Sequence, residues 1–350
     1  MTKRILFDCE RLKYPNTGLY TFCKSLGSAL IQNKHDDEQI TAYIPSNAIN
    51  IFGKNVKYFI QKPWHKIFIP RAEKFNIWHC SNQVSRYFPT DKNIKIVLTI
   101  HDLNFLIEKK NRRSKVDKLL KQIQKQIDRA SAVVCISHFV AAQVKEYFNL
   151  EQKDVAVIYN GCTINNYPEV HSFNDLPSKP FLFTIGTVLP KKNFHVLPAL
   201  LKHNDYELII AGNYSDPDYI KKIKAEALKF GVSDRVKIIG AISDEKRSWY
   251  YKNCKAFVFP SMAEGFGLPV IEAMHYSKPV FLSNLTSLPE IGGDAAYYFD
   301  NFDPESMQKA LIDGLNDFST GNMAKKAKQR ALSFNWNNTA RAYLEIYKSI

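Results

Sequence analysis

Glu264 and Glu272 are the side chains whose type and spacing indicate chemistry most directly in this sequence. A carboxylate accepts strong hydrogen bonds from hydroxyl groups, so two glutamates in one short stretch suit a sugar or another polyol. Because phosphate carries the same negative charge, neither glutamate is expected to bind a phosphate directly. Backbone N–H groups at the start of a helix do bind phosphates. Glutamates beside a helix start therefore indicate a ligand that has both hydroxyl and phosphate groups.

The residues around the glutamates predict such a helix start. The apolar run at 256–259 is typical of a buried parallel strand, and it ends at Pro260 and Ser261. A turn with two glycines follows, and a helix is predicted to begin near Leu268, where Pro269 fits the first turn. The predicted ligand contacts in this stretch are Ser261, Gly265, Phe266, Gly267, Leu268 and Glu272, together with Glu264.

The stretch from Glu264 to Glu272 resembles the signature of the family 4 glycosyltransferases, which are retaining enzymes of the GT-B architecture. The intervening letters GFGLPVI match as well as the two ends. The resemblance covers nearly the whole chain and is sharpest at 181–300. It implies that the donor is a nucleoside-diphosphate sugar, that Glu264 holds sugar hydroxyls and that Glu272 holds ribose hydroxyls. A retaining front-face mechanism needs no covalent nucleophile.

A second strand and turn suit the diphosphate. The segment 181–186 predicts a strand ending at Gly186, and Lys191 and Lys192 precede a predicted helix. Lysines are unfavourable helix-dipole partners at that end, which favours a bound anion. The family pattern places a basic residue after the glycine, where this chain has Thr187, and another at Lys192; we expect Lys191 to substitute for the first. The Gly-Thr…Pro-Lys-Lys-Asn form resembles a subgroup rich in mannosyltransferases of bacterial surface polysaccharides.

The first half of the chain supplies two further candidates. Gly18 lies in the loop between a predicted strand at 4–8 and a predicted helix at 19–31, where glycine permits close approach of a ligand. His101 follows a predicted strand at 94–100, and ligands of parallel sheets bind at such carboxyl ends. A histidine there also suits a purely structural role. The resemblance favours contact with the donor sugar or phosphate, so the predicted catalytic residues are Glu264, His101 and Lys192.

The net charge of +14 indicates an anionic partner. Residues 1–175 hold 26 Lys+Arg against 16 Asp+Glu, and nine of these basic residues lie in the segment 109–129. Its apolar residues follow helical spacing, so one face is expected to be buried and the other cationic. A solvated helix face and contact with an anionic membrane both fit this pattern. Nucleic acid also fits the charge, but the segment lacks interleaved aromatic residues.

Alternating strands and helices predict an α/β protein with two doubly wound, Rossmann-like domains facing across a cleft. The predicted domains are an acceptor-binding domain at 1–170, a nucleotide-sugar domain at 171–335, and a C-terminal helix at 336–350 packed back on the first domain. The six scattered cysteines predict neither a disulfide framework nor a zinc site. No apolar run is long enough to span a membrane and none at the N-terminus suggests a signal peptide, so we expect a cytoplasmic protein.

These observations predict a retaining, metal-independent hexosyltransferase that uses a nucleotide sugar and a glycan or lipid-linked acceptor. GDP-mannose is the first choice of donor, through the subgroup resemblance alone. A UDP-sugar donor remains open, as do a phosphorylase or epimerase of similar architecture and a basic nucleic-acid-binding protein. We assign no metal, because Asp216 and Asp218 suit the start of a helix, where aspartates act as caps.

Overall fold

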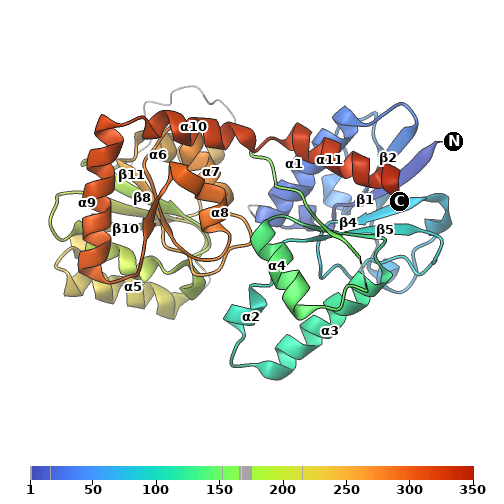
Figure 1. The fold of residues 1–350 in the computed structure, drawn as a ribbon, viewed down its shortest axis with the longest axis horizontal. Coiled ribbons are helices and arrows are strands. Elements are labelled where there is room, and N and C mark those ends of the chain that lie inside the picture. Colours follow the sequence, from blue (N-terminus) through green and yellow to red (C-terminus); the bar gives the residue numbers. More distant parts are fainter. Residues whose placement is uncertain (1, 16, 152, 165–166, 168–175, 215) are drawn as a thin grey trace. The chain divides into compact units, whose positions relative to one another are not determined.

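The chain folds into two compact units, shown in Figure 1. Unit 1 comprises Met1–Thr163 and Phe334–Ile350, and unit 2 comprises Ile164–Ser333. The structure is a computed structural model that describes residues 2–15, 17–151, 153–164, 167, 176–214 and 216–350. The predicted domain boundary between 170 and 171 therefore lies outside the described residues.

Unit 1 is built on a seven-stranded sheet in which every pairing is parallel. The strand order is β3-β2-β1-β4-β5-β6-β7, so the direction of winding reverses between β1 and β4. The strands are β1 (Lys3–Asp8), β2 (Glu38–Ile44), β3 (Lys57–Ile60), β4 (Ile77–Cys80), β5 (Lys95–Ile100), β6 (Ala132–Cys135) and β7 (Val155–Val157). The helices are α1 (Gly18–Asn33), α2 (Phe105–Glu108), α3 (Arg113–Arg129), α4 (His138–Tyr147) and α11 (Trp336–Ser349).

Both faces of this sheet are buried, each in its own core. Successive strand residues point to opposite faces, so Ile5 and Phe7 enter one core while Leu6 enters the other. The first core holds the apolar sides of α1 and α11, and the second holds those of α3 and α4. Figure 1 shows these two pairs of helices on opposite sides of the sheet. Burial on both faces explains why the strands read as continuous apolar runs.

A buried polar network fastens α11 to the sheet of unit 1. The His79 ring lies 2.6 Å from the Tyr347 hydroxyl through Nδ1 and 2.8 Å from the Thr99 hydroxyl through Nε2. The Thr99 hydroxyl also lies 2.9 Å from the Tyr343 hydroxyl. Burial lowers the pKa of His79 to about 3, so its ring is neutral. Each buried polar group in the network has a partner, as burial requires.

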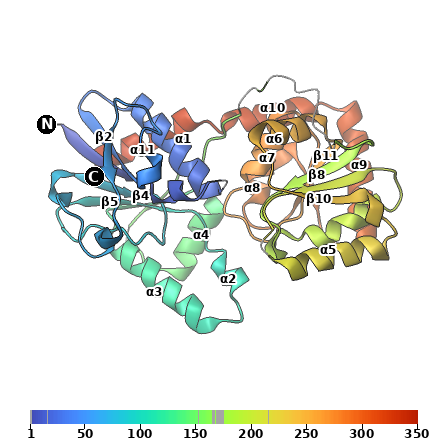
Figure 2. The same ribbon diagram turned by 180° about the vertical axis from the view of Figure 1, so that it is seen from behind.

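Unit 2 repeats the same plan with a six-stranded parallel sheet. The order is β10-β9-β8-β11-β12-β13, with the reversal between β8 and β11. The strands are β8 (Phe181–Ile185), β9 (Glu207–Ala211), β10 (Val236–Gly240), β11 (Ala256–Phe259), β12 (Val280–Ser283) and β13 (Tyr297–Phe299). The helices are α5 (Pro217–Lys229), α6 (Asp244–Asn253), α7 (Leu268–His275), α8 (Leu288–Gly292), α9 (Pro304–Thr320) and α10 (Met323–Ser333). Figure 2 shows α5 on one side of this sheet and α6 and α7 on the other.

The helix predicted after Lys192 is present, but it is a 3₁₀ helix and not an α-helix. Lys191 and Lys192 belong to a short 3₁₀ turn, Pro190–Lys192, and the following Phe194–Leu201 is also a 3₁₀ helix. Asn193, with a φ of +57°, separates the two, and Pro198 lies inside the second. Pro198 has no N–H to donate, so the helical hydrogen bonds are interrupted at that residue.

The predicted cap at Asp216 and the predicted buried face of the basic helix are confirmed. Asp216 caps α5, because its side chain accepts a hydrogen bond of 3.0 Å from the Tyr219 N–H. The six cysteines, all within the described residues, form no disulfide with one another, and Cys162 is the one that is not fully buried. In α3, Ile123 and Ile127 are buried as the helical spacing predicts. Within the described part of the chain, no helix is both long and apolar enough to span a bilayer.

Candidate active site

Lys192 and Glu264 form an ion pair at the switch point of unit 2, where the loops that follow β8 and β11 meet. The Lys192 Nζ lies 2.5 Å from the Glu264 Oε1 and 4.9 Å from the centroid of the Phe259 ring. The two charged side chains are only 13% and 14% exposed. Ligands of doubly wound folds bind at this position in the sheet, so the pair stands where a donor would be expected.

Backbone contacts hold the two loops together. The Lys191 carbonyl accepts a hydrogen bond of 2.8 Å from the Met262 N–H and one of 3.3 Å from the Ser261 hydroxyl. The Ser261 carbonyl accepts one of 2.5 Å from the Ser283 hydroxyl. Ser261, expected to contact the donor, is completely buried, so the structure gives its hydroxyl a positioning role between the loops.

Gly186 leaves room for the Lys192 side chain. Its φ is +156°, and a Cβ built there would lie 3.3 Å from the Lys192 Cε. A larger residue would push the lysine away from Glu264. Thr187, which stands where the family pattern has a basic residue, is exposed.

The turn that carries Glu264 is supported from the segment before α8. The Glu264 N–H donates to the Thr286 Oγ1 at 3.2 Å. The buried Ser287 hydroxyl donates to the carbonyls of Glu264 at 3.1 Å and Phe266 at 2.9 Å. These contacts fix the turn in front of α7. The prediction that α7 begins at Leu268 is confirmed, with Gly267 as its N-cap residue.

Glu272 lies in α7 and does not share the partner of Glu264. Its Oε2 is 3.7 Å from the Nε of Arg247. The Nη2 of Arg247 also lies 3.1 Å from the Oδ1 of Asp244, the first residue of α6. Burial raises the pKa of the Glu272 carboxyl, and the Arg247 charge and the Tyr251 hydroxyl offset part of that rise. The two glutamates, predicted to hold the donor sugar and the ribose, therefore have different cationic partners: Glu264 pairs with Lys192, and Glu272 lies beside Arg247.

His101 lies in unit 1, directly after β5. Its Nε2 donates a hydrogen bond of 2.8 Å to the Ser81 carbonyl, because a carbonyl can only accept. Burial lowers the pKa of His101 to about 4, so the ring is neutral and its Nδ1 is an acceptor. The Phe22 ring of α1 packs edge-on at 4.5 Å between centroids. The ring is thus suited to accept a hydrogen bond from a hydroxyl, and not to donate one to a phosphate.

Gly18 is the first residue of α1 and is exposed. A Cβ built on it would have no atom within 4 Å, and its φ is not positive. Its surroundings therefore leave space above the backbone, whereas its conformation does not require glycine.

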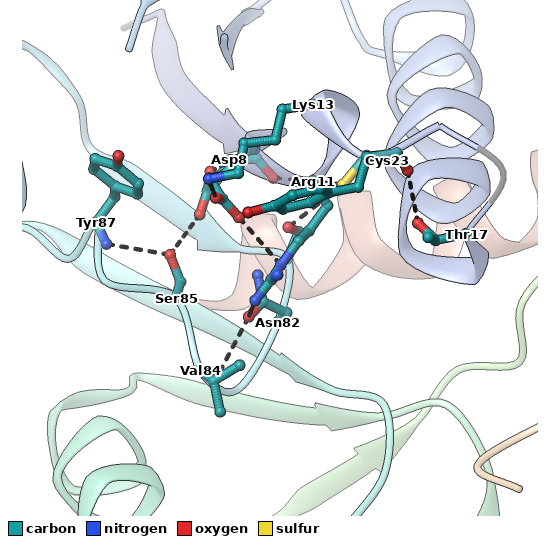
Figure 3. Close-up of polar contacts among 12 residues, drawn as sticks. Asp8, Arg11, Lys13, Thr17, Cys23, Asn82, Val84, Ser85 and Tyr87 are labelled. Carbon is teal, nitrogen blue, oxygen red and sulfur yellow. Dashed lines mark hydrogen bonds and ion pairs between the residues drawn. The ribbon is translucent and has the colours of Figure 1, made fainter. Parts of the chain in front are cut away.

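A polar cluster at the switch point of unit 1 was not predicted from the sequence. Asp8 ends β1 and is completely buried. Its Oδ1 accepts a hydrogen bond of 3.0 Å from the Glu10 N–H, and its Oδ2 accepts one of 2.8 Å from the Ser85 hydroxyl (Figure 3). Burial raises the pKa of Asp8 to about 7, although these two hydrogen bonds oppose the rise.

Charged side chains extend this cluster outward. Glu10 pairs with the Lys13 ammonium and, at 3.1 Å, with the Arg11 Nε. The Arg11 Nη2 donates to the Asn82 Oδ1 at 3.3 Å, as Figure 3 shows. Asn82 is 1% exposed, and its Nδ2 has no partner among the residues that the structure describes. A buried amide donor without a partner is costly, which is typical of a site that awaits a polar ligand.

The residues that sequence reasoning missed share one property. Arg247, Thr286, Asp8 and Asn82 each act on a residue distant in the chain, and none belongs to a recognisable spacing pattern. Asp8 was identifiable only as the last residue of a predicted strand. Ser287 lies in the stretch 287–291, which also resembles the family, although no role was predicted for its side chain.

Comparisons with known proteins agree with this arrangement. The family model described as Glycosyltransferase Family 4 matches residues 29–166, and the one described as Glycosyl transferases group 1 matches 167–333. The O-antigen chain mannosyltransferase B of Escherichia coli is 24% identical over 99% of both chains. The serotype-specific mannosyltransferase WbdA of Escherichia coli is 29% identical over 72% of this chain and 33% of its own length.

A solved structure confirms the fold. HepE of Anabaena, crystallised in complex with UDP-glucose, superposes with a TM-score of 0.76 over 99% of this chain and 100% of HepE, at 17% identity. Its GT-B architecture corresponds to the two parallel, doubly wound sheets described above. Consecutive family models spanning residues 29–333 and this shared fold show that the chain belongs to the family 4 glycosyltransferases of the GT-B fold.

Proposed function

We propose that this glycosyltransferase transfers a hexose, with mannose the first candidate, from a nucleoside-diphosphate sugar to a hydroxyl of a glycan or lipid-linked oligosaccharide in surface-polysaccharide synthesis. The observation that carries the proposal is the Lys192–Glu264 pair at the switch point of unit 2. It places a cation for a diphosphate beside a carboxylate for sugar hydroxyls. Support for mannose comes from the names of the curated relatives.

Lys192 is proposed to stabilise the leaving diphosphate. Negative charge develops on that group as the glycosidic bond to the nucleotide breaks, and a preorganised cation favours the charged transition state. The neighbouring Lys191 and the N-terminus of α7 are proposed to add to this field. Because protein cations and N–H groups would supply the neutralisation, we propose a metal-independent reaction.

Glu264 is proposed to orient the donor sugar and Glu272 the ribose. In the structure Glu264 is paired with Lys192, so a bound donor would take over part of that contact. Backbone N–H groups of residues 265–268 would contact the sugar or the phosphates from the start of α7. His101, neutral and with Nδ1 as an acceptor, is proposed to accept a hydrogen bond from a hydroxyl of the donor sugar.

The polar cluster of unit 1 is proposed to contact the acceptor. Arg11 and Glu10 provide donors and acceptors at the carboxyl end of β1, and Tyr14, 47% exposed, lies beside Lys13. Such groups suit the hydroxyls and the apolar face of a sugar. We propose retention of the anomeric configuration, with the leaving diphosphate itself accepting the proton of the acceptor hydroxyl.

The experiment that tests this function is thermal stabilisation by nucleotides and nucleotide sugars in the presence of EDTA. A ligand of the folded state raises the melting temperature in proportion to the logarithm of its excess over Kd. Stabilisation by GDP and GDP-mannose would support the proposed donor. Stabilisation by UDP and UDP-glucose, which the HepE complex makes the second candidate, would keep the enzyme class and exclude GDP-mannose. No stabilisation by any nucleotide would contradict the proposal.

A further inference from the structure

The segment Lys62–Lys74 of unit 1 displays three large apolar side chains to solvent. Trp64 is 51% exposed, Ile67 84% and Phe68 59%. Among the large hydrophobic residues of the described chain, Ile67 has the highest exposed fraction. Three large apolar side chains are thus exposed within five residues of one another, and apolar exposure concentrated in this way is typical of a binding surface.

This exposure is built into an anchored segment. His65 is 3% exposed, and its Nδ1 lies 2.9 Å from the hydroxyl of the buried Tyr43. Ile69 and Ala72 are buried in the core that α3 and α4 cover. The N–H groups of Ile67 and Phe68 both donate to the Trp64 carbonyl, at 3.0 and 3.3 Å. The buried residues of the segment therefore fix its backbone, while the three apolar side chains stay exposed to solvent.

Positive charge surrounds the apolar residues. The segment contains four exposed cations and one exposed carboxylate, Glu73; the cations are Lys62, Lys66, Arg71 and Lys74. Within the described residues, none of the four forms an ion pair with a carboxylate. An apolar centre with a cationic rim complements a surface that is apolar inside and anionic outside.

A second cationic surface lies on the same layer of unit 1. Ile69 and Ala72 share their core with Ile123 and Ile127 of α3. The opposite side of α3 exposes Lys115, Lys118, Lys121 and Lys125. Figure 1 shows α3 on the side of the sheet away from α1 and α11. Both positive surfaces therefore belong to one side of the unit, which a planar partner could contact at once.

We propose that the segment Lys62–Lys74 docks unit 1 on an anionic bilayer, with Trp64, Ile67 and Phe68 entering the boundary between headgroups and acyl chains. Tryptophan favours that depth, and lysine and arginine bind the anionic headgroups above it. Two kinds of contact act together, as stable peripheral binding requires. This docking does not depend on the glycosyl transfer proposed above.

The test is co-flotation of the protein with phosphatidylcholine vesicles that contain or lack phosphatidylglycerol. We expect binding that rises with the anionic fraction and falls about tenfold or more in the double variant Ile67→Ser/Phe68→Ser. The matched control is Leu228→Ser/Leu332→Ser, which removes side chains of unit 2 that are 74% and 59% exposed and should bind like wild type. Melting temperature and nucleotide-sugar binding in solution should be unchanged in both double variants, which separates this proposal from the catalytic one.

The depth to which Trp64 enters the bilayer and the contribution of the lysines to binding are measured separately. Vesicles of brominated lipid should quench a part of the tryptophan fluorescence that Trp64→Phe removes. Lys62→Ser/Lys66→Ser should weaken binding to anionic vesicles and make the remaining binding less sensitive to salt than that of wild type. Equal vesicle binding by wild type and the apolar double variant would overturn the proposal. So would loss of a concentration-dependent dimer in that variant, seen by sedimentation, with vesicle binding retained, because the segment would then be a surface for self-association.

Discussion

The Lys192 ammonium contacts the Glu264 carboxylate at 2.5 Å, although 71 residues lie between them in the chain. Their loops follow β8 and β11, strands that are adjacent in the sheet. Each was predicted from its own local pattern, one for phosphate and one for hydroxyls. Their contact means that a single sugar diphosphate could engage both, so we propose that the pair links leaving-group stabilisation to sugar orientation.

Lys192→Ala should reduce kcat by about 10²–10³-fold, which corresponds to roughly 2.7–4 kcal/mol for one lost electrostatic contact to the leaving group. Steady-state kinetics at saturating donor measures this. Lys237→Ala is the matched control, because Lys237 is paired with Glu207 at 2.9 Å elsewhere in unit 2 and should leave kcat unchanged. Adding Glu264→Gln to Lys192→Ala should recover any lost stability without recovering turnover. A wild-type rate in Lys192→Ala would exclude the proposed role.

Glu272→Ala should weaken donor binding while the fold is retained. Loss of charge-assisted hydrogen bonds of about 1.5–3 kcal/mol corresponds to a rise of roughly 10- to 100-fold in the KM for the donor. Glu226→Ala, which removes another helical glutamate paired with a lysine, should have no such effect. Titration of donor at fixed acceptor measures the change. Identical rates for the variant and wild type at every donor concentration would refute the assignment.

His101→Gln should lower kcat/KM by about tenfold, and by the same factor at each pH between 6 and 8. The reason is that burial lowers the pKa of His101 to about 4, so the side chain does not titrate in this range. Parallel pH profiles of wild type and variant are the expected result. A profile in which wild type loses activity near pH 6.5 and the variant does not would show that the ring becomes charged in the active enzyme.

Asp8→Asn should change how the free energy of unfolding depends on pH. The pKa of Asp8 is raised to about 7, so between about pH 4 and 7 the folded state binds a proton that the unfolded state has released. Its contribution to stability is therefore fully present at low pH and is lost as the pH rises through that window, by up to about 1.4 kcal/mol per unit.

The buried histidines also make the free energy of unfolding depend on pH. The effect of Asp8 must therefore be measured as the difference between wild type and Asp8→Asn. The lowered pKa values of His79 and His101 have the opposite effect, since they reduce stability as the pH falls below about 6.5. Urea denaturation of wild type and Asp8→Asn at several pH values cancels that shared effect. The stability of wild type relative to Asp8→Asn should fall from pH 4 to 7. A constant difference would contradict the assigned pKa.

Gly267→Ala and Gly18→Ala form a matched pair. Gly267 has a φ of +121°, and a Cβ there would lie 3.0 Å from the Leu288 Cδ2, so alanine should destabilise the protein by about 1–3 kcal/mol. Alanine at Gly18, in an open helical position, should not destabilise it. If Gly18 leaves space for substrate, its variant should nevertheless lose activity. Full activity in a stable Gly18→Ala would remove Gly18 from the site.

Strand positions and the start of α7 could be predicted from the sequence because their causes are local. Apolar runs mark strands buried on both faces, and Pro269 marks the first turn of a helix. The resemblance at Glu264–Glu272 identified the family for the same reason, since its residues are consecutive. The helix after Lys192 was predicted but its 3₁₀ geometry was not, because apolar content alone does not distinguish a 3₁₀ helix from an α-helix.

What the sequence alone determined is thus the order of elements, the glycosyltransferase family and the identity of most candidate residues. Only the tertiary structure decided which of them meet. It paired Lys192 with Glu264, gave Glu272 a different partner in Arg247, and turned the Nε2–H of His101 toward the Ser81 carbonyl. The cluster around Asp8 likewise exists only because β1 and β4 are adjacent in the sheet. Such contacts join residues far apart in the chain, and their free energies depend on burial that no local pattern encodes.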